Sequence, residues 1–285
     1  KVSPEFWADI TNFEGNANAF RLLTHQFAGR RPGGFVMTYS TLAAIVKYPF
    51  ASSLAGKHGK FGFFCSEAST FEQIADELGL IRLSAPGEPL RYVRHPLVYL
   101  MEAADDICYE IMDIEDSHKL KILSFDETKN LLLSIFDNDT QEEIIRRLKE
   151  EGFTDENEQV VYLRACVVGK LENECVQTFV EHEDEILNGT FKGTLIGNTS
   201  EPQRLAYKHC SEVSFKRIYR SKPVLDIELS GYKIMETLMQ SLISAVVQPD
   251  RFHSKQIIER VSSQYDIHSD DLETRIMAVL DYISG

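Results

Sequence analysis

The segment 95-HPLVYLMEAADDICYEIMDIED-116 has the apolar spacing of a helix, but acidic residues interrupt it repeatedly. Pro96 fits the first turn of a helix, where the missing backbone N–H of proline has no cost. With about 3.6 residues per turn, the apolar side chains fall on one broad face, which predicts that the helix packs against a core. The residues of this predicted apolar face are Leu97, Leu100, Met101, Ala104, Ile107, Cys108, Ile111, Met112 and Ile114.

Three residues of this segment, Asp105, Tyr109 and Asp113, are spaced four apart, which places them in a row along the helix. Asp105 is expected at the edge of the apolar face, beside Met101 and Met112, where a partly desolvated carboxylate needs a cation or a hydrogen-bond donor. Asp105 is therefore a candidate metal ligand, and the other two residues are candidates for binding a hydroxylated ligand. One carboxylate does not make a divalent-metal site, so the row alone leaves the metal open. The remaining acidic residues are expected on a solvated face: Asp106, Glu110 and Asp116.

Helical spacing continues through most of the chain. Gly79 fits the end of a helix at 72–79, and Gly189 fits the end of one at 158–190. Residues 126–151 also read as helix with a break near 137–140, while 223–229 reads as a short strand. We therefore expect an all-α fold with few or no strands. Further helices are expected at 203–219, 230–247, 253–265 and 269–283.

Composition excludes several classes of protein. The chain has 285 residues, 43% of them hydrophobic, and a net charge of −14, which argues against general coating of nucleic acid. Its five cysteines are scattered without a CxxC pair, which favours reduced thiols over a disulfide framework. No apolar run approaches the roughly 20 residues of a membrane span, and the first residues do not resemble a signal peptide. We expect a cytoplasmic protein without a membrane partner.

One segment departs from this acidic composition. From Gly15 to Cys65 the sequence contains no Asp or Glu, although the whole chain holds 44 of them. Several glycines punctuate the segment and would let backbone N–H groups approach a phosphate, so an anion site is favoured over a basic patch that pairs with acidic helices. Neither a P-loop nor a Rossmann phosphate motif occurs here. The cations of this acid-free segment are Arg21, Arg30, Arg31, Lys47, Lys57 and Lys60.

The chain resembles the deoxynucleoside triphosphate triphosphohydrolases, the dGTPase-like branch of the HD-domain phosphohydrolases. The most specific resemblance lies in the acidic helix, and the later helices match more loosely. This resemblance implies an HD-domain-type helical architecture and hydrolysis of a dNTP, dGTP first among them, to deoxynucleoside and tripolyphosphate. The segments that carry it are 12-NFEGNANAFRLL-23, 45-IVKYPF-50, 59-GKFGFF-64, 94-RHPLVYLMEAADDICYEIMDIED-116 and 280-LDYISG-285.

The resemblance also implies a divalent metal, Mg, Mn or similar, bound by a His, a His-Asp pair and a distant Asp. Asp105 in 103-AADD-106 matches the distant Asp, but no His-Asp dipeptide occurs in the 285 residues. We therefore expect one helical domain over 1–285 that is part of a longer HD-domain protein. Its other metal ligands and its catalytic proton-transfer groups are expected upstream of Lys1, and a C-terminal tail beyond the chain.

Roles for the binding residues follow from the same resemblance. Tyr109 and Asp113 match the pair that holds the sugar 3′-hydroxyl, with the tyrosine ring packed where a 2′-hydroxyl would not fit. We expect an active-site half at 1–135 and a helical C-terminal half at 136–285. The residues that match triphosphate contacts are Asn16, Lys47, Tyr48 and Lys60.

Two other functions stay open from the sequence. The missing His-Asp pair would suit a non-catalytic module that senses dNTPs, and another HD nucleotidase or phosphodiesterase would share only Asp105. The family resemblance further implies a homo-oligomer, sometimes a hexamer, and activation of some relatives by single-stranded DNA or by nucleotides. The sequence fixes neither the base preference nor the metal.

Overall fold

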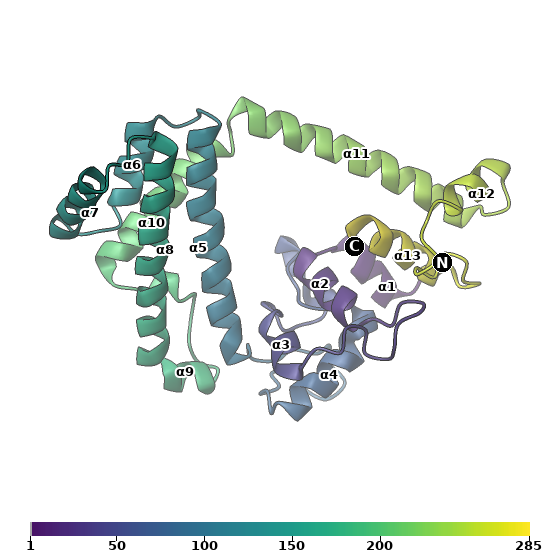
Figure 1. Cartoon of the computed structure of the whole chain (residues 1–285). Helices are drawn as coiled ribbons and strands as arrows, with labels where there is room; N and C mark the ends of the chain where they lie inside the picture. The colour runs from purple at the N-terminus through teal and green to yellow at the C-terminus, as the bar shows by residue number, and fades with distance from the viewer. Residues whose placement is uncertain (1) are drawn as a thin grey trace. The chain divides into compact units, whose positions relative to one another are not determined.

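The structure, a computed structural model, describes residues 2–285 and consists mainly of helices (Figure 1). Across this range no extended segment forms a sheet with another. The prediction of an all-α fold with few or no strands is therefore confirmed, while the HD-domain-type architecture stays a prediction. The isolated backbone bridges are Phe50 with Arg91, Ala51 with Phe63, and Arg82 with Tyr92.

The contacts divide the chain into two compact units. Unit 1 is discontinuous: it contains the chain up to Val98 and then Ser230–Gly285. Unit 2 is the continuous stretch Tyr99–Leu229. These boundaries differ from the expected halves 1–135 and 136–285, whose functional division stays a prediction.

Unit 1 has an aromatic core. Phe20 meets Phe71 edge-on at 5.8 Å between ring centroids, and Phe63 stacks on Phe71 at 4.5 Å. All three rings are almost completely buried, so they remove a large apolar area from water. The helices around this core and the neighbouring apolar clusters are α1 (Pro4–Thr11), α2 (Gly15–Thr24), α3 (Tyr39–Ala44), α4 (Ala68–Glu77), α12 (Phe252–Ile258) and α13 (Leu272–Ser284), with the C-terminal part of α11 (Lys222–Val247).

Between α3 and α4 the chain of unit 1 folds into short 3₁₀ turns and bridges. Gly62 donates its N–H to the carbonyl of Phe50 at 3.0 Å. A Cβ atom at position 62 would collide with the Tyr48 carbonyl oxygen and the Val46 side chain. Glycine is therefore required for the close approach of the segments 46–50 and 60–63. The 3₁₀ turns are Ser52–Leu54, Gly56–His58 and Cys65–Glu67.

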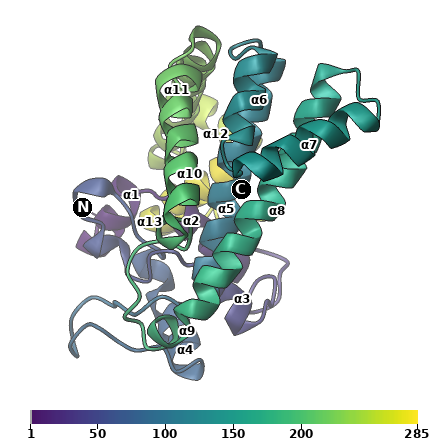
Figure 2. The same cartoon turned by 90° about the vertical axis from the view of Figure 1, so that its left-hand side faces the viewer.

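Unit 2 is a set of helices, seen from one side in Figure 2. One apolar cluster of buried side chains packs them together. Ile107, Ile111 and Ile114 of the long acidic helix are buried in it, which confirms that this helix turns an apolar stripe to the core. Arg164 bonds the carboxylate of Glu115 at 2.7 Å and so joins two of the helices. The helices of unit 2 are α5 (Pro96–Lys119, from its second turn onward), α6 (Phe125–Leu133), α7 (Asn138–Glu150), α8 (Glu156–Glu181), α9 (Glu183–Leu187) and α10 (Glu201–Val213), with the first residues of α11.

Several helix ends form where the sequence predicted them. Gly79 and Gly189 follow α4 and α9 with positive φ angles, a conformation that glycine adopts without a side-chain clash. The single helix expected at 158–190 is, however, divided at His182 into α8 and α9. Asp137 caps α7 by accepting a hydrogen bond from the Thr140 N–H at 2.9 Å, which explains the break after α6. Ser124 and Glu127 form a capping box at the start of α6.

Three local expectations are corrected. The strand expected at 223–229 is wrong, because these residues form the start of the 26-residue α11. The helix expected at 253–265 ends already at Ile258. The helix expected at 203–219 includes a π-helical turn, Ser214–Ile218, that follows α10 directly.

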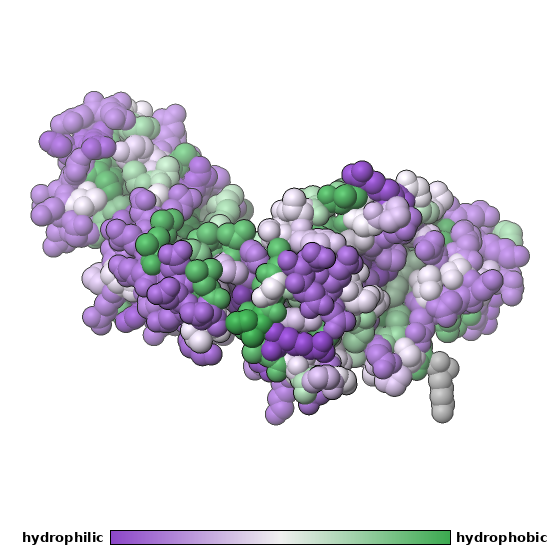
Figure 3. All heavy atoms as spheres, turned by 90° about the horizontal axis from the view of Figure 1, so that it is seen from below, coloured by the Kyte–Doolittle hydropathy of each residue, from purple (hydrophilic) through white to green (hydrophobic). Residues whose placement is uncertain are grey.

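Polar side chains cover much of the surface seen in Figure 3, with apolar side chains in patches among them. The longest helices, α8 and α11, each have 26 residues. Acidic and basic side chains occur along α8, whereas those of α11 end at Glu236. Among the helices of residues 2–285, none has the length and apolar character needed to cross a membrane.

Candidate functional site

In unit 1, two of the predicted triphosphate contacts meet at a single carboxylate. Glu14 precedes α2 and is only 6% exposed. Its Oε1 accepts hydrogen bonds from Lys60 Nζ at 3.0 Å and Asn16 Nδ2 at 3.2 Å. Its Oε2 accepts from the backbone N–H groups of Asn16 at 2.6 Å and Ala17 at 3.2 Å. Glu14 therefore occupies the N-terminus of α2, a position that favours an anion.

Tyr48 lies beside the same group of residues. The Lys60 ammonium nitrogen lies 5.9 Å from the centroid of the Tyr48 ring, within the range of a cation–π interaction. The close backbone approach at Gly62 holds the Tyr48 segment against the Lys60 segment. Lys47, the chain neighbour of Tyr48, is half-buried. The structure thus brings Asn16, Tyr48 and Lys60 together, with Lys47 adjacent in the chain.

Glu14 is the residue of this site that the sequence analysis missed. The acid-free segment begins at Gly15, so Glu14 lies immediately outside it. Its position directly before the α2 pattern was the available signal, since an acidic residue there can cap the helix. Its partner Lys60 is 46 residues away, and this pairing has no local signal.

Arg21, another cation of the acid-free segment, is already neutralised. Its Nε and Nη2 donate to the two carboxylate oxygens of Asp281, each at 2.8 Å, and its Nη1 donates to Glu67 Oε1 at 2.5 Å. All three residues are at most 5% exposed. Burial tends to lower the pKa of Arg21, but the hydrogen bonds and charges of the two carboxylates raise it overall. For Arg21, the sequence had left two interpretations, an anion site or pairing with acidic residues elsewhere in the chain. The structure shows the second.

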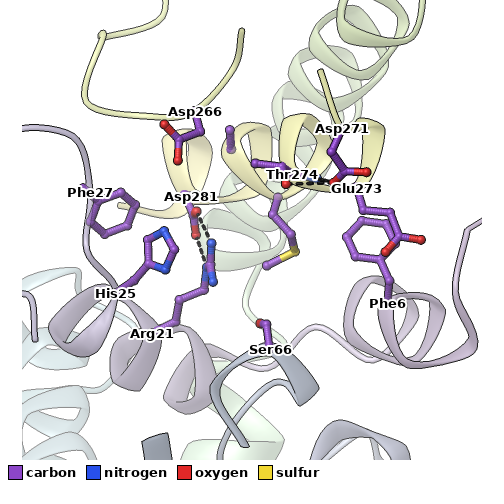
Figure 4. Close-up of a pocket in the computed structure, with 12 residues that line it drawn as sticks. Phe6, Arg21, His25, Phe27, Ser66, Asp266, Asp271, Glu273, Thr274 and Asp281 are labelled. Atoms are coloured by element: carbon purple, nitrogen blue, oxygen red, sulfur yellow. Dashed lines mark hydrogen bonds and ion pairs between the residues drawn. The ribbon is translucent and has the colours of Figure 1, made fainter. Parts of the chain in front are cut away.

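A cavity of about 270 Å³ lies next to this ion pair in unit 1. Figure 4 shows Arg21 of α2 directed at Asp281 of α13, with His25 and Phe27 beside them. Asp266, Asp271 and Glu273 also line the cavity, so its charge does not suit a phosphate. Burial and the charge of Arg21 lower the pKa of His25, which favours a neutral imidazole there. This cavity is therefore not the predicted anion site.

In unit 2, the predicted row lies on α5 but its members differ in environment. Asp105 is exposed, and Tyr109 is 67% exposed. Asp113 is half-buried and accepts a hydrogen bond from the Tyr219 hydroxyl at 2.6 Å. The expectation that Asp105 is partly desolvated is therefore wrong in this structure, because Asp105 lies on the solvent-exposed face of α5.

The polar side of α5 also differs from expectation. Glu110 is 8% exposed rather than solvated, because Ser211 and Ser214 donate to its carboxylate at 2.9 and 2.6 Å. Asp106 is half-buried, whereas Asp116 is exposed as expected. The burial arises because α10 packs on this side, and the buried face of α5 is displaced from the predicted one: Tyr99 and Ala103 are buried, although they were not part of the predicted apolar face. The predicted apolar residues that are exposed instead are Leu97, Ala104, Cys108 and Met112.

Asp105 does not make a metal site with the residues that surround it. Within residues 2–285, no three or more His, Cys, Asp or Glu side chains are grouped so that they could hold a metal ion. A single carboxylate supplies too few ligands for a divalent ion. The described residues therefore do not fit the predicted metal by themselves, and metal binding by Asp105 stays a prediction.

Known proteins resemble this chain along almost all of its length. A "Deoxyguanosinetriphosphate triphosphohydrolase-like protein" of Synechocystis sp. is 33% identical over 295 residues, which cover 100% of this chain and 64% of the relative. A protein of the same description from Pseudomonas aeruginosa is 31% identical over 292 residues, with 98% of this chain and 63% of the relative covered. The "Deoxyguanosinetriphosphate triphosphohydrolase" of Yersinia enterocolitica is 25% identical over 279 residues, with 92% and 52% covered.

No family model matches the chain. The chain spans less than two thirds of the length of the curated relatives described above. The alignment with the Synechocystis protein covers the whole of this chain, and therefore includes both the segment around Glu14 and α2 and the helix α5. This chain belongs to the deoxyguanosinetriphosphate triphosphohydrolase-like family.

Proposed function

We propose that this chain supplies substrate-binding residues of a dNTP triphosphohydrolase, with dGTP as the first candidate substrate. The reaction would release a deoxynucleoside and tripolyphosphate. The observation that carries the proposal is the meeting of Asn16 and Lys60 at Glu14, with the Tyr48 ring beside Lys60, in a chain of this family.

In unit 1 the proposed ligand is the triphosphate. Lys60 has three N–H donors, and Glu14 accepts only one of them, so the others can reach phosphate oxygens. The lysine side chain is 52% exposed, which leaves its ammonium group accessible. Asn16 adds an amide, and Lys47 a second positive charge, to offset the charge of the leaving tripolyphosphate.

In unit 2 the proposed ligand is the deoxyribose. Tyr109 presents an exposed ring that would pack against the sugar and exclude a 2′-hydroxyl. Asp113, one helical turn later, would accept a hydrogen bond from the 3′-hydroxyl. Asp105 would contribute one oxygen ligand to a divalent ion such as Mg or Mn.

The test is the identity of the products. Full-length protein is incubated with each dNTP and Mg or Mn, and the products are separated by chromatography. Tripolyphosphate plus deoxynucleoside is the expected result. Orthophosphate would favour another HD phosphohydrolase, and binding of dNTP without any turnover would favour the sensing module.

Lys60→Ala tests the proposed triphosphate contact. Inhibition by free tripolyphosphate should weaken about tenfold, because a charge-assisted hydrogen bond is lost, while binding of deoxyguanosine should not change. Lys57→Ala is the matched control, since it removes an exposed cation from the same acid-free segment. Equal losses in both variants would indicate a general charge effect and contradict the specific contact.

A further inference from the structure

Asp113 of α5 is held by a residue to which the sequence gave no role. The Tyr219 hydroxyl donates to Asp113 Oδ2 at 2.6 Å, across 106 residues of sequence. Burial and the neighbouring carboxylates of Asp113 and Glu110 raise the pKa of Tyr219, so its hydroxyl keeps its proton and acts as the donor. The contact lies entirely within unit 2.

The backbone that carries Tyr219 is unusual. Residues Ser214–Ile218 form a π-helical turn after α10, in which the Tyr219 N–H donates to the Ser214 carbonyl at 3.0 Å. This hydrogen bond spans five residues and places Tyr219 one turn after Ser214 on the same side of the chain. The hydroxyls of both residues therefore reach carboxylates of α5. A regular α-helical turn would place Ile218 at this level instead. π-helical turns are rare and occur frequently at functional sites.

The π-helical turn is anchored at its start. Ser214 is buried and donates to Glu110 Oε1 at 2.6 Å, while Ser211 donates to Glu110 Oε2 at 2.9 Å. Glu110 and Asp113 are three residues apart and therefore neighbours on α5. Two serines and one tyrosine thus fix two successive carboxylates of the same helix.

The remaining capacity of Asp113 points toward a ligand. Its Oδ2 is engaged by Tyr219, and within the described residues its Oδ1 accepts no hydrogen bond. The donor is a neutral hydroxyl, so the carboxylate is oriented without its charge being cancelled by a cation. Tyr109, four residues earlier on α5, is exposed next to it. An oriented, charged oxygen with free lone pairs is a good acceptor for a substrate hydroxyl.

We propose that Tyr219 is the positioning residue for Asp113: it holds one carboxylate oxygen so that the other accepts the sugar 3′-hydroxyl. This inference rests on the proposed function. It adds Tyr219, which directly follows the π-helical turn, to the recognition of the deoxyribose. Tyr219 acts through Asp113 and does not itself contact the substrate.

Tyr219→Phe tests the proposal, because it removes only the hydroxyl of a partly exposed ring. For the full-length protein, kcat/KM for dGTP should fall about tenfold, the effect of losing one hydrogen bond to a charged group. For 2′,3′-dideoxy-GTP, which lacks the 3′-hydroxyl, the variant and the unaltered protein should have equal kcat/KM. Thermal unfolding of both proteins is measured alongside, and the two Tm values should agree within a few degrees.

Tyr207→Phe is the matched control. The Tyr207 hydroxyl also joins α10 to α5, but it donates to the backbone carbonyl of Asp106 at 2.9 Å. This variant should change kcat/KM for the two nucleotides by the same factor. A purely structural role for Tyr219 predicts the same pattern for Tyr219→Phe.

The outcomes separate the two proposals. The role of Tyr219 would be overturned if Tyr219→Phe lost kcat/KM equally on dGTP and 2′,3′-dideoxy-GTP, or lost none on either. Hydrolysis of dGTP by the unaltered protein would still support the proposed function in that case. If the unaltered full-length protein hydrolyses no dNTP, the proposed function fails. The same comparison is then made with equilibrium binding of deoxyguanosine and 2′,3′-dideoxyguanosine. A loss in Tyr219→Phe confined to deoxyguanosine would retain the positioning role, and equal affinities would overturn it.

Discussion

Two groups of carboxylates, one in unit 1 and one in unit 2, are satisfied in different ways. In unit 1, Asp281 and Glu67 face the guanidinium of Arg21, and all three side chains are almost completely buried. In unit 2, Glu110 and Asp113 of α5 accept hydrogen bonds from the hydroxyls of α10 and of the π-helical turn. The first arrangement contains a cation, and the second contains neutral donors.

This difference distinguishes a structural cluster of carboxylates in unit 1 from the proposed binding residues of unit 2. Arg21 is buried and bound by two carboxylates, so its charge is not accessible to a ligand and the cluster mainly ties α2 to α13. Within residues 2–285, Lys60 is bound by the carboxylate of Glu14 alone and keeps an exposed ammonium group. Hydroxyl donors orient a carboxylate and leave its charge in place, so α5 keeps acceptors for a hydroxyl group or a cation. The contrast explains why Arg21, although part of the acid-free segment, is a poor candidate for phosphate binding, while Asp113 is a good candidate for sugar binding.

The largest expected effect is in the buried ion pair. Arg21→Met should lower the free energy of unfolding by about 3–5 kcal/mol, because Asp281 and Glu67 would be left buried without their cation. Chemical denaturation followed by circular dichroism measures this change. Arg147→Met is the control, since Arg147 pairs with Glu143 on the exposed surface of α7, and its loss should lower the stability far less. If both variants lowered the free energy of unfolding by similar amounts, the buried Arg21 cluster would be no more important for stability than an exposed ion pair.

A smaller effect is expected where hydroxyls replace the cation. Ser214→Ala should lower the free energy of unfolding by about 1–3 kcal/mol, because Glu110 keeps Ser211 but loses its shorter hydrogen bond. Ser134→Ala is the control, since this exposed hydroxyl donates only to a backbone carbonyl. A loss as large as that of Arg21→Met would contradict this ranking. It would show that removing a hydroxyl donor from a buried carboxylate destabilises the fold as much as removing a cation.

The smallest effect is a pH dependence in unit 2. Burial tends to raise the pKa of Glu115, but the hydrogen bond from Lys119 and the charge of Arg164 lower it below the usual 4.5. Since the folded-state pKa is depressed, this carboxylate contributes stability above about pH 4.5, and the contribution is lost as the pH falls through the lowered value. Urea midpoints measured from about pH 5 to about pH 3 should therefore decrease. Arg164→Met should reduce that decrease, and an unchanged pH profile would contradict the assignment.

Much of the fold follows from local signals in the sequence. Pro96 and the 3–4 spacing correctly placed α5, and Gly79 and Asp137 marked real helix boundaries. The strand expected at 223–229 failed because its short alternating pattern is part of a continuous 26-residue helix. The π-helical turn at Ser214–Ile218 has no sequence signature of its own, since it depends on the fit of α10 against α5.

The candidate site was predictable only in part. The acid-free segment identified Lys47 and Lys60, and the family resemblance added Asn16 and Tyr48. Glu14, which lies just outside that segment, was missed. So was Tyr219, which lies 106 residues from Asp113, because such pairings are decided by tertiary packing and not by local pattern.

The discontinuity of unit 1 has a consequence for biosynthesis. Arg21 leaves the ribosome 260 residues before Asp281, so the nascent α2 cannot complete its ion pair until α13 has been synthesised. Unit 2, which is continuous, can finish folding earlier, as domains made from one stretch of chain generally do. Stalled translation products that lack α13 should therefore contain a mature unit 2 and an immature unit 1, which makes them natural substrates for chaperones and proteases.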